Sequence, residues 1–225
     1  MAELLPCVEV GPETDAEGAV VWLHGLGASG HDFEDIVPML RLPRVRFVFP
    51  HAPQHAVTIN GGLLMPAWYD IVSLMGPTGG EREAHVRESA ELVEALLARE
   101  RERGVPSERT VLAGFSQGAA MALFAGTRHA HPLAGLMMLS GYEVLPATRE
   151  AEASPASAAT PMFFAHGSYD PMVPLARGRA AHQAYAAGRE AVWHEYPMAH
   201  QVCEPEIADI REWLTVRLAP PAPGR

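Results

Sequence analysis

The chain has 225 residues, of which 48% are hydrophobic and 20% are charged, and this composition suits one globular α/β domain with a sizeable core. The net charge is −10, which argues against nucleic acid as a partner. All 17 basic residues are arginine, so no lysine is available for Schiff-base, P-loop or Ser-Lys chemistry. No apolar run is long enough for an integral membrane segment, and the first residues do not resemble a signal peptide, so we expect a cytoplasmic protein.

The first predicted elements are a short edge strand over residues 5–10 and a buried strand over residues 19–23. The second strand is apolar throughout, as parallel strands covered on both faces are. A loop from His24 to Gly30 follows, and it contains a G-x-G-x-x-G sequence typical of dinucleotide-binding sites. A glycine-rich loop at this place is also typical of esterases, in which it directs a backbone N–H at the reacting oxygen.

These two interpretations of the glycine loop differ in what must follow it. A dinucleotide site requires an acidic residue about 20 positions later, at the end of the next strand. After a predicted helix over residues 31–40, the next strand covers residues 45–49 and ends in Pro-His-Ala-Pro, without a carboxylate. We therefore favour the esterase interpretation, with the N–H of Leu26 as an oxyanion donor, over a nucleotide-binding oxidoreductase.

Residues 51–80 are irregular and rich in proline, glycine, methionine and aromatic side chains. Irregular segments of this length are usually functional loops. We assign the segment to a substrate pocket, with Met65 and Trp68 as candidate wall residues, although Trp68 could instead only pack the loop onto the body of the domain. His51 and His55 do not form a predicted metal site, because Pro53 between them excludes a helix.

The clearest predicted helix covers residues 81–103. Its apolar positions fall on one stripe, and its charged residues are predicted to form a solvated face. The members of the stripe are Val86, Ala90, Val93 and Leu97. No catalytic residue is expected there.

The sequence Gly114-Phe115-Ser116-Gln117-Gly118 is a G-x-S-x-G motif between a predicted strand at residues 110–115 and a predicted helix at residues 117–130. In this context the serine lies on a sharp strand-to-helix turn, and glycines avoid Cβ collisions around it. The free N–H groups and the positive dipole end of the new helix point at a developing oxyanion. Ser116 is therefore the predicted nucleophile, and it requires a base.

The alternation of strands and helices continues along the rest of the chain. Strands are predicted at residues 134–139, 161–165 and 191–196, helices at 175–187 and 205–218, and a surface loop or weak helix at 147–160. We expect one α/β domain over residues 1–219 and a proline-rich tail over residues 220–225. Cys7 and Cys203 are far apart in sequence and are predicted to be buried or partly buried free thiols.

Asp170 follows the predicted strand at 161–165, at the strand end where functional groups of open α/β sheets gather. Its alternative role is that of an Asx-turn residue. Val173 on the same loop is a further candidate pocket residue. Among the eleven histidines, His200 alone combines a loop after the last predicted strand with a position C-terminal to Ser116 and Asp170. The order Ser, Asp, His is that of α/β-hydrolases.

Several motifs in order resemble the phospholipase/carboxylesterase family of α/β-hydrolases, which includes bacterial carboxylesterases and acyl-protein thioesterases. They are residues 23–27, 50–53, 68–70 and 114–118, then His166-Gly167 with Asp170, and His200 with Cys203. The resemblance covers nearly the whole chain. It implies an α/β-hydrolase fold, with a mostly parallel sheet of about seven strands and helices on both faces.

The resemblance also implies roles for individual residues. Ser116 would be the nucleophile, His200 the base and Asp170 the orienting acid, and the N–H groups of Leu26 and Gln117 would form the oxyanion hole. No metal or cofactor is expected. Two departures from the family pattern could reshape the pocket or a subunit contact. The loop at residues 140–146 looks longer than usual, and residue 201 is a glutamine where serine is common.

We therefore expect a serine hydrolase that cleaves carboxylic esters of short to medium acyl chains through an acyl-enzyme intermediate. An acyl-protein thioesterase or lysophospholipase with the same triad is the main alternative. A nucleotide-binding oxidoreductase and a non-catalytic binding module are the distant ones. The expected partner is a small-molecule ester or an acylated substrate, not nucleic acid, and the resemblance makes a homodimer a possible assembly.

Overall fold

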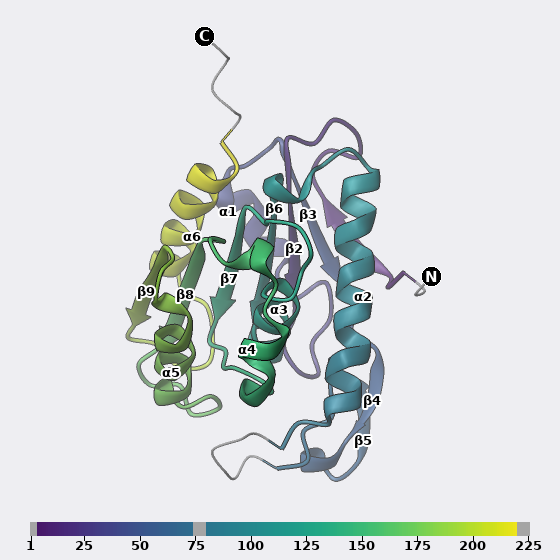
Figure 1. The fold of residues 1–225 in the computed structure, drawn as a ribbon, viewed down its shortest axis with the longest axis vertical. Helices are drawn as coiled ribbons and strands as arrows, with labels where there is room; N and C mark the ends of the chain where they lie inside the picture. The colour runs from purple at the N-terminus through teal and green to yellow at the C-terminus, as the bar shows by residue number, and fades with distance from the viewer. Residues whose placement is uncertain (1–3, 74–79, 220–225) are drawn as a thin grey trace.

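The central feature of the computed structural model, which describes residues 4–73 and 80–219, is a twisted sheet between two layers of helices (Figure 1). The seven strands of this sheet have the order β1-β3-β2-β6-β7-β8-β9. Their bounds are Cys7–Val10 (β1), Gly18–Leu23 (β2), Val45–Pro50 (β3), Thr110–Phe115 (β6), Gly135–Leu139 (β7), Met162–Gly167 (β8) and Ala191–Tyr196 (β9). Only β1 pairs antiparallel within this sheet. The predicted α/β-hydrolase fold and mostly parallel sheet are confirmed.

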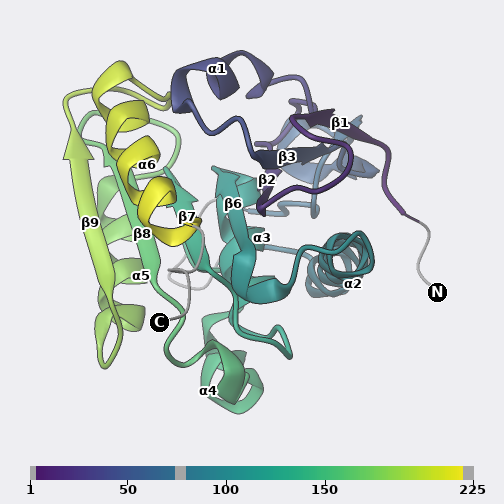
Figure 2. The same ribbon diagram turned by 90° about the horizontal axis from the view of Figure 1, so that it is seen from above.

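Helices cover both faces of the sheet, as Figure 2 shows from above. Helices α2 (Glu83–Glu102), α3 (Gln117–Gly126) and α5 (Leu175–Ala186) lie on one face, and α1 (Val37–Leu40) and α6 (Glu204–Arg217) lie on the other. In β2 the side chains alternate between these layers: Val21 and Leu23 join the core under α2 and α3, and Val20 and Trp22 join the core under α6. Burial on both faces explains why β2 is apolar throughout.

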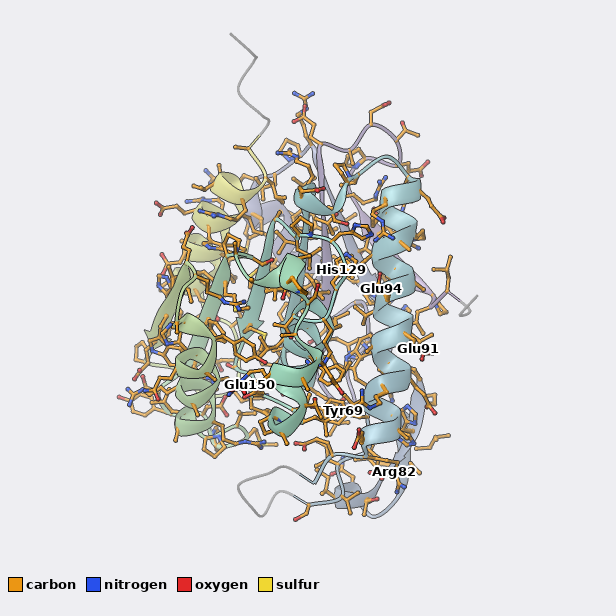
Figure 3. All side chains as sticks on the ribbon, in the orientation of Figure 1. Tyr69, Arg82, Glu91, Glu94, His129 and Glu150 are labelled. Atoms are coloured by element: carbon orange, nitrogen blue, oxygen red, sulfur yellow. The ribbon has the colours of Figure 1, made fainter. Side chains whose placement is uncertain are left out.

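Helix α2 has almost the predicted bounds, but its charged residues are not all solvated. Glu100 is completely buried, and its Oε2 accepts a hydrogen bond of 2.8 Å from Nε of the equally buried Arg46 on β3. On the same helix, Glu94 lies beside His129 and is joined to it at 2.6 Å (Figure 3). This hydrogen bond lowers the pKa of Glu94. The prediction of a wholly solvated face is wrong at Glu100, because a buried arginine from a strand far away in sequence supplies its partner.

Three further segments differ from the predictions in length or regularity. The predicted helix at 31–40 is reduced to a 3-10 turn and α1, and the chain after α1 turns at Arg41 with φ of 54°. The predicted helix at 117–130 ends at Gly126. Within the segment predicted to be irregular, β4 (Gln54–Val57) and β5 (Leu63–Pro66) form a hairpin. Gly61 and Gly62 both have positive φ in its turn, a backbone that glycine adopts easily.

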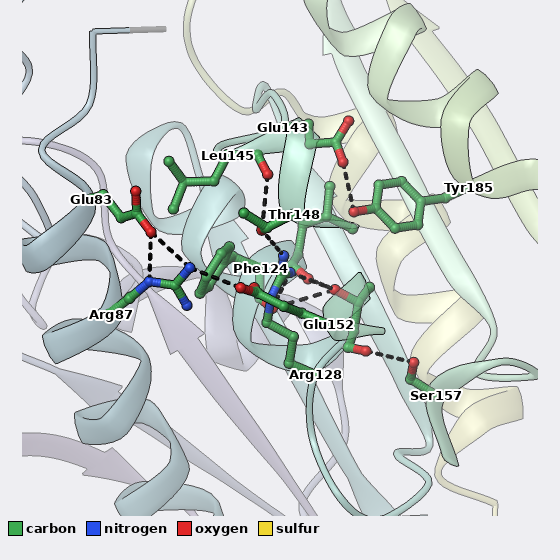
Figure 4. A network of polar contacts seen from close by, with 12 residues as sticks. Glu83, Arg87, Phe124, Arg128, Glu143, Leu145, Thr148, Glu152, Ser157 and Tyr185 are labelled. Carbon is green, nitrogen blue, oxygen red and sulfur yellow. Dashed lines mark hydrogen bonds and ion pairs between the residues drawn. The ribbon is translucent and has the colours of Figure 1, made fainter. Parts of the chain in front are cut away.

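The segment after the long 140–146 loop contains α4 (Arg149–Glu152), a single short helix held by ion pairs. Glu152 accepts hydrogen bonds of 2.8 Å from Arg87 on α2 and from Arg128 beyond α3 (Figure 4). These two hydrogen bonds lower the pKa of Glu152 to about 2. Arg128 also donates to Oγ1 of Thr148 at 2.7 Å. The predicted surface loop or weak helix is therefore joined to both neighbouring helices.

Cys7 and Cys203 are free and half-buried, as predicted. No helix in the described parts of the chain is long and apolar enough to span a membrane. The predicted tail at residues 220–225 lies outside the described residues.

Candidate active site

Ser116 occupies the sharp turn between β6 and α3, with φ of 55° and ψ of −118°. Positive φ is a strained conformation for a residue with a side chain, and such strain is typical of functional sites. The backbone N–H of Ser116 donates to the carbonyl oxygen of Leu139 on β7 at 2.8 Å. A Cβ at Gly114 would overlap the carbonyl oxygen of Gly118, and a Cβ at Gly118 would overlap that of Leu23. Both glycines are therefore required by close backbone packing at the turn.

The structure brings Ser116, His200 and Asp170 into one hydrogen-bonded chain. His200 Nε2 lies 2.8 Å from Ser116 Oγ, and His200 Nδ1 lies 2.7 Å from Asp170 Oδ2. Ser116 and His200 are half-buried, whereas the Asp170 side chain is fully buried. The same order of contacts joins the nucleophile, the base and the orienting carboxylate in serine hydrolases.

Asp170 also has the turn geometry that was the alternative explanation for it. Its Oδ1 accepts hydrogen bonds of 2.8 and 2.9 Å from the backbone N–H groups of Met172 and Val173. One carboxylate oxygen therefore orders the loop after β8, while the other contacts His200. The two roles are compatible because each uses a different oxygen.

The loops that carry these side chains follow the carboxyl ends of three parallel strands, at the same edge of the sheet. Ser116 follows β6, Asp170 follows β8 and His200 follows β9. Hydrogen bonds join the last two loops directly, since Tyr169 N donates to Met198 O at 3.0 Å. A Cβ at Gly167 would overlap Ala199 O, so the glycine permits this close approach.

The backbone N–H groups of Leu26 and Gln117 both belong to residues that line the cavity with Ser116. Gln117 is the first residue of α3, so its N–H has no partner within the helix. The Gln117 side chain is fixed by two backbone hydrogen bonds of 2.8 Å, accepting from Trp68 N and donating to Tyr69 O. Tyr69, labelled in Figure 3, follows β5 in the chain. These bonds tie the start of α3 to the segment after β5.

His24 shapes the glycine loop from inside the protein. Burial lowers the pKa of His24, which keeps its imidazole neutral. Nε2 accepts a hydrogen bond of 3.0 Å from Ala52 N, and Nδ1 lies 2.7 Å from Gly25 O, which matches a neutral ring with its proton on Nδ1. The carbonyl oxygen of His24 accepts from the Trp68 indole at 2.8 Å. His24 is thus a loop-ordering residue.

The geometry after the glycine loop does not match a dinucleotide site. Such sites place the pyrophosphate at the N-terminus of a helix that begins in the loop. Here the chain after Gly30 forms turns and a 3-10 segment before α1, which is only four residues long. Gly25 instead packs against the Ser116 turn, since a Cβ there would lie 3.4 Å from side-chain atoms of Phe115 and Ser116.

A cavity of about 340 Å³ opens at Ser116 and His200. Met65 and Val173, which were candidate pocket residues, both line it. Trp68 does not line it: the side chain is fully buried, and its ring packs 5.6 Å from the His24 ring, so the wall assignment is wrong. Trp68 supports the loop because its indole N–H found a buried backbone acceptor there.

The structure also reveals wall residues that the sequence did not suggest. They include Ile59, Ile71, Phe115, Tyr142, Met172 and Arg177. Tyr142 lies in the 140–146 loop, and the expectation that this loop is longer than usual was the one sequence signal pointing to this region. No sequence pattern indicated that Arg177 lines the cavity, because a charged residue in the first turn of a predicted helix is expected to lie at the surface. Within residues 4–73 and 80–219, no group of three or more His, Cys, Asp or Glu side chains could hold a metal ion.

We compared the chain with protein families and with known relatives. Residues 6–218 match the phospholipase/carboxylesterase family. The chain is 34% identical to acyl-protein thioesterase 1 of Yarrowia lipolytica, covering 93% of this chain and 96% of that protein. It is 37% identical to acyl-protein thioesterase 1 of Neurospora crassa, covering 88% of this chain and 86% of that protein.

Solved structures show the same architecture. Acyl-protein thioesterase 2 of Zea mays has a TM-score of 0.83 at 28% identity, covering 95% of this chain and 99% of that one. Esterase PE8 has a TM-score of 0.83 at 29% identity, with the same coverage. The carboxylesterase of Bacillus cereus shares the fold with a TM-score of 0.75 at 17% identity, covering 95% of this chain and 94% of that one. The chain belongs to the phospholipase/carboxylesterase family of α/β-hydrolases.

Proposed function

We propose that the protein is a serine esterase that hydrolyses carboxylic esters of short to medium acyl chains through an acyl-enzyme intermediate. The observation that carries this proposal is the continuous contact from Ser116 Oγ to His200 Nε2, at 2.8 Å, and from His200 Nδ1 to Asp170 Oδ2, at 2.7 Å. Ser116 and His200 line a cavity whose volume suits a small ester.

The proposed reaction has two steps. His200 Nε2 takes the proton of Ser116 as its oxygen attacks the ester carbonyl, and the resulting oxyanion accepts hydrogen bonds from the N–H groups of Leu26 and Gln117. His200 then protonates the leaving alcohol, and it later activates a water molecule that releases the acid from Ser116. Asp170 holds the imidazole in the tautomer that leaves Nε2 free to accept the proton.

The size and lining of the cavity support short to medium acyl chains. A volume of about 340 Å³ lies near the lower end of the usual range of ligand pockets. Its apolar wall includes Ile59, Ile71 and Val173, which suit an alkyl chain.

A thioesterase acting on acylated proteins is the second candidate. It is favoured by the relatives at 34% and 37% identity that are named acyl-protein thioesterase 1. The same nucleophile, base and oxyanion donors would serve a thioester or a lysophospholipid, so these functions differ from the first only in the substrate. The nucleotide-binding oxidoreductase has no such support, because the glycine loop is not followed by a helix that begins within it.

Hydrolysis of p-nitrophenyl esters from acetate to palmitate, by wild type and Ser116→Ala side by side, tests the proposal. We expect an optimum at short to medium chains and a kcat lower by about 10⁴ to 10⁶ in Ser116→Ala. Activity that rises toward palmitate, or a strong preference for a thioester of the same acyl group, would favour the second candidate. Turnover that does not depend on Ser116 would contradict both.

Cytoplasmic location and a homodimer stay predictions from the sequence. Cell fractionation tests the first, and light scattering of the purified protein tests the second.

A further inference from the structure

Two charged side chains of opposite sign line the cavity in addition to His200. Among the described residues of its wall, Asp32 carries the one carboxylate and Arg177 the one guanidinium. Asp32 belongs to the segment after β2, and Arg177 belongs to α5, which follows β8. Because β2 and β8 lie on opposite sides of β6 in the sheet, the two charges belong to segments that leave the sheet on either side of the strand before Ser116.

The guanidinium of Arg177 is held in place by an aromatic ring. Its central carbon lies 3.8 Å from the ring centroid of Tyr142. Tyr142 is itself fixed, since its hydroxyl is hydrogen-bonded at 2.8 Å to the hydroxyl of the fully buried Tyr69. Stacking of this kind orients the plane of the guanidinium and limits the entropy that it loses on binding a ligand.

Arg177 is only loosely paired with protein carboxylates. Its nearest one is Glu81, at 3.6 Å from a terminal nitrogen, which is longer than a hydrogen bond. Burial raises the pKa of Glu81, and the charge of Arg177 opposes this rise. The contact with Glu81 involves one terminal nitrogen of the guanidinium. By contrast Arg179, two positions later, donates to Glu195 at 2.8 Å.

The guanidinium therefore keeps donors for a ligand. An arginine side chain has five N–H donors and no acceptor, and its planar fork fits the two oxygens of a carboxylate. The Arg177 side chain is 33% exposed, and it lines the cavity beside the apolar side chains of Met172 and Val173. An apolar wall strengthens a charge interaction, because it excludes water from one side of the pair.

We propose that Arg177 binds a carboxylate carried by the substrate, so that the enzyme prefers an ester with a free carboxylate away from the scissile bond to a neutral ester of the same length. The inference rests on the proposed esterase function and names the substrate class for it. Asp32, on the other side of Ser116, repels the same carboxylate and so sets the orientation of the substrate in the cavity.

Two matched pairs of alkyl esters test this preference, and they distinguish a carboxylate in the acid from one in the alcohol. Monomethyl adipate is compared with methyl hexanoate, in which a methyl group replaces the carboxylate. The acetate ester of 4-hydroxybutanoate is compared with butyl acetate. Acid release is followed in a pH-stat with wild type, and Ser116→Ala gives the background. The quantity compared is the ratio of kcat/KM for the charged ester to that for the neutral one.

The decisive variant is Arg177→Met, with Arg179→Met as the matched control on the same helix. We expect a wild-type ratio above one in one of the two pairs, and a fall of about tenfold or more in Arg177→Met, the size of a charge-assisted hydrogen bond. Arg179→Met should keep the wild-type ratio. Arg177→Lys retains a positive charge near Glu81 but loses the planar fork, so it should give an intermediate ratio even if Arg177→Met does not fold.

The failures of the two proposals are distinguishable. Ser116-dependent hydrolysis in which wild type prefers the neutral ester of both pairs would overturn the inference alone. The same holds for a ratio that stays at the wild-type value in Arg177→Met or Arg177→Lys. If none of the four esters is hydrolysed in a Ser116-dependent manner, the esterase function fails, and the carboxylate preference fails with it.

Discussion

Replacing Asp170 by asparagine changes one oxygen into an NH₂ group and leaves the shape of the side chain nearly unchanged. The Oδ1 position must stay an oxygen, because two backbone N–H groups donate to it at 2.8 and 2.9 Å. The new NH₂ group therefore occupies the Oδ2 position, 2.7 Å from His200 Nδ1. A donor there favours the tautomer with Nδ1 unprotonated, which puts the proton on Nε2 and blocks its function as a base for Ser116.

The size of the effect follows from these contacts. The charge-assisted hydrogen bond between Asp170 and His200 contributes about 1.5 to 3 kcal/mol, and two donors that face each other cost about 1 to 3 kcal/mol more. Together they raise the barrier by about 2.5 to 6 kcal/mol, which lowers kcat/KM by about 10² to 10⁴. A substitution of this kind in a known serine protease triad lowers kcat by about 10⁴.

The assay is hydrolysis of a p-nitrophenyl ester by Asp170→Asn, with the thermal unfolding midpoint measured in parallel to show that the loop is intact. Asp209→Asn is the matched control, because Asp209 lies 3.3 Å from His194 and outside the cavity. The control should keep wild-type kcat/KM. A folded Asp170→Asn variant with wild-type kcat/KM would refute the role given to Asp170.

Three predictions concern the framework around the site. Gln117→Leu leaves two buried backbone groups of the segment after β5 unpaired, so the free energy of unfolding in urea should fall by about 2 to 6 kcal/mol. An unchanged free energy would contradict the role of the Gln117 side chain in fixing that segment. Gly118→Ala places a Cβ against Leu23 O, so the thermal unfolding midpoint should drop sharply or folded protein should be lost, and a midpoint equal to wild type would refute the packing argument. Burial raises the pKa of Glu206 from 4.5 to about 8, so between these pH values the folded chain holds a proton that the unfolded chain releases. The free energy of unfolding should therefore fall as the pH rises through this window. Glu206→Gln cannot ionise and should lose less stability over that window in pH-dependent denaturation, whereas parallel curves would show that Glu206 does not titrate in this way.

The order of the strands in the large sheet along the chain, the buried character of β2, and the turn at Ser116 were all predictable from the sequence. These features depend on neighbours along the chain: apolar runs predict buried strands, and glycines predict a backbone that must pass close to another. The choice of His200 among eleven histidines used two such features: its loop after the last predicted strand, and its position C-terminal to Ser116 and Asp170.

Tertiary structure decided which side chains meet. It placed Trp68 behind the cavity, paired Glu100 with Arg46, and directed Arg177 at the space beside Ser116. Each of these contacts joins segments tens of residues apart, so no local pattern of hydrophobicity or turn residues encodes them. A charged residue on a helix has the same sequence signature whether it faces solvent, a buried partner or a substrate. Only the packing of distant elements determines which of the three surrounds it.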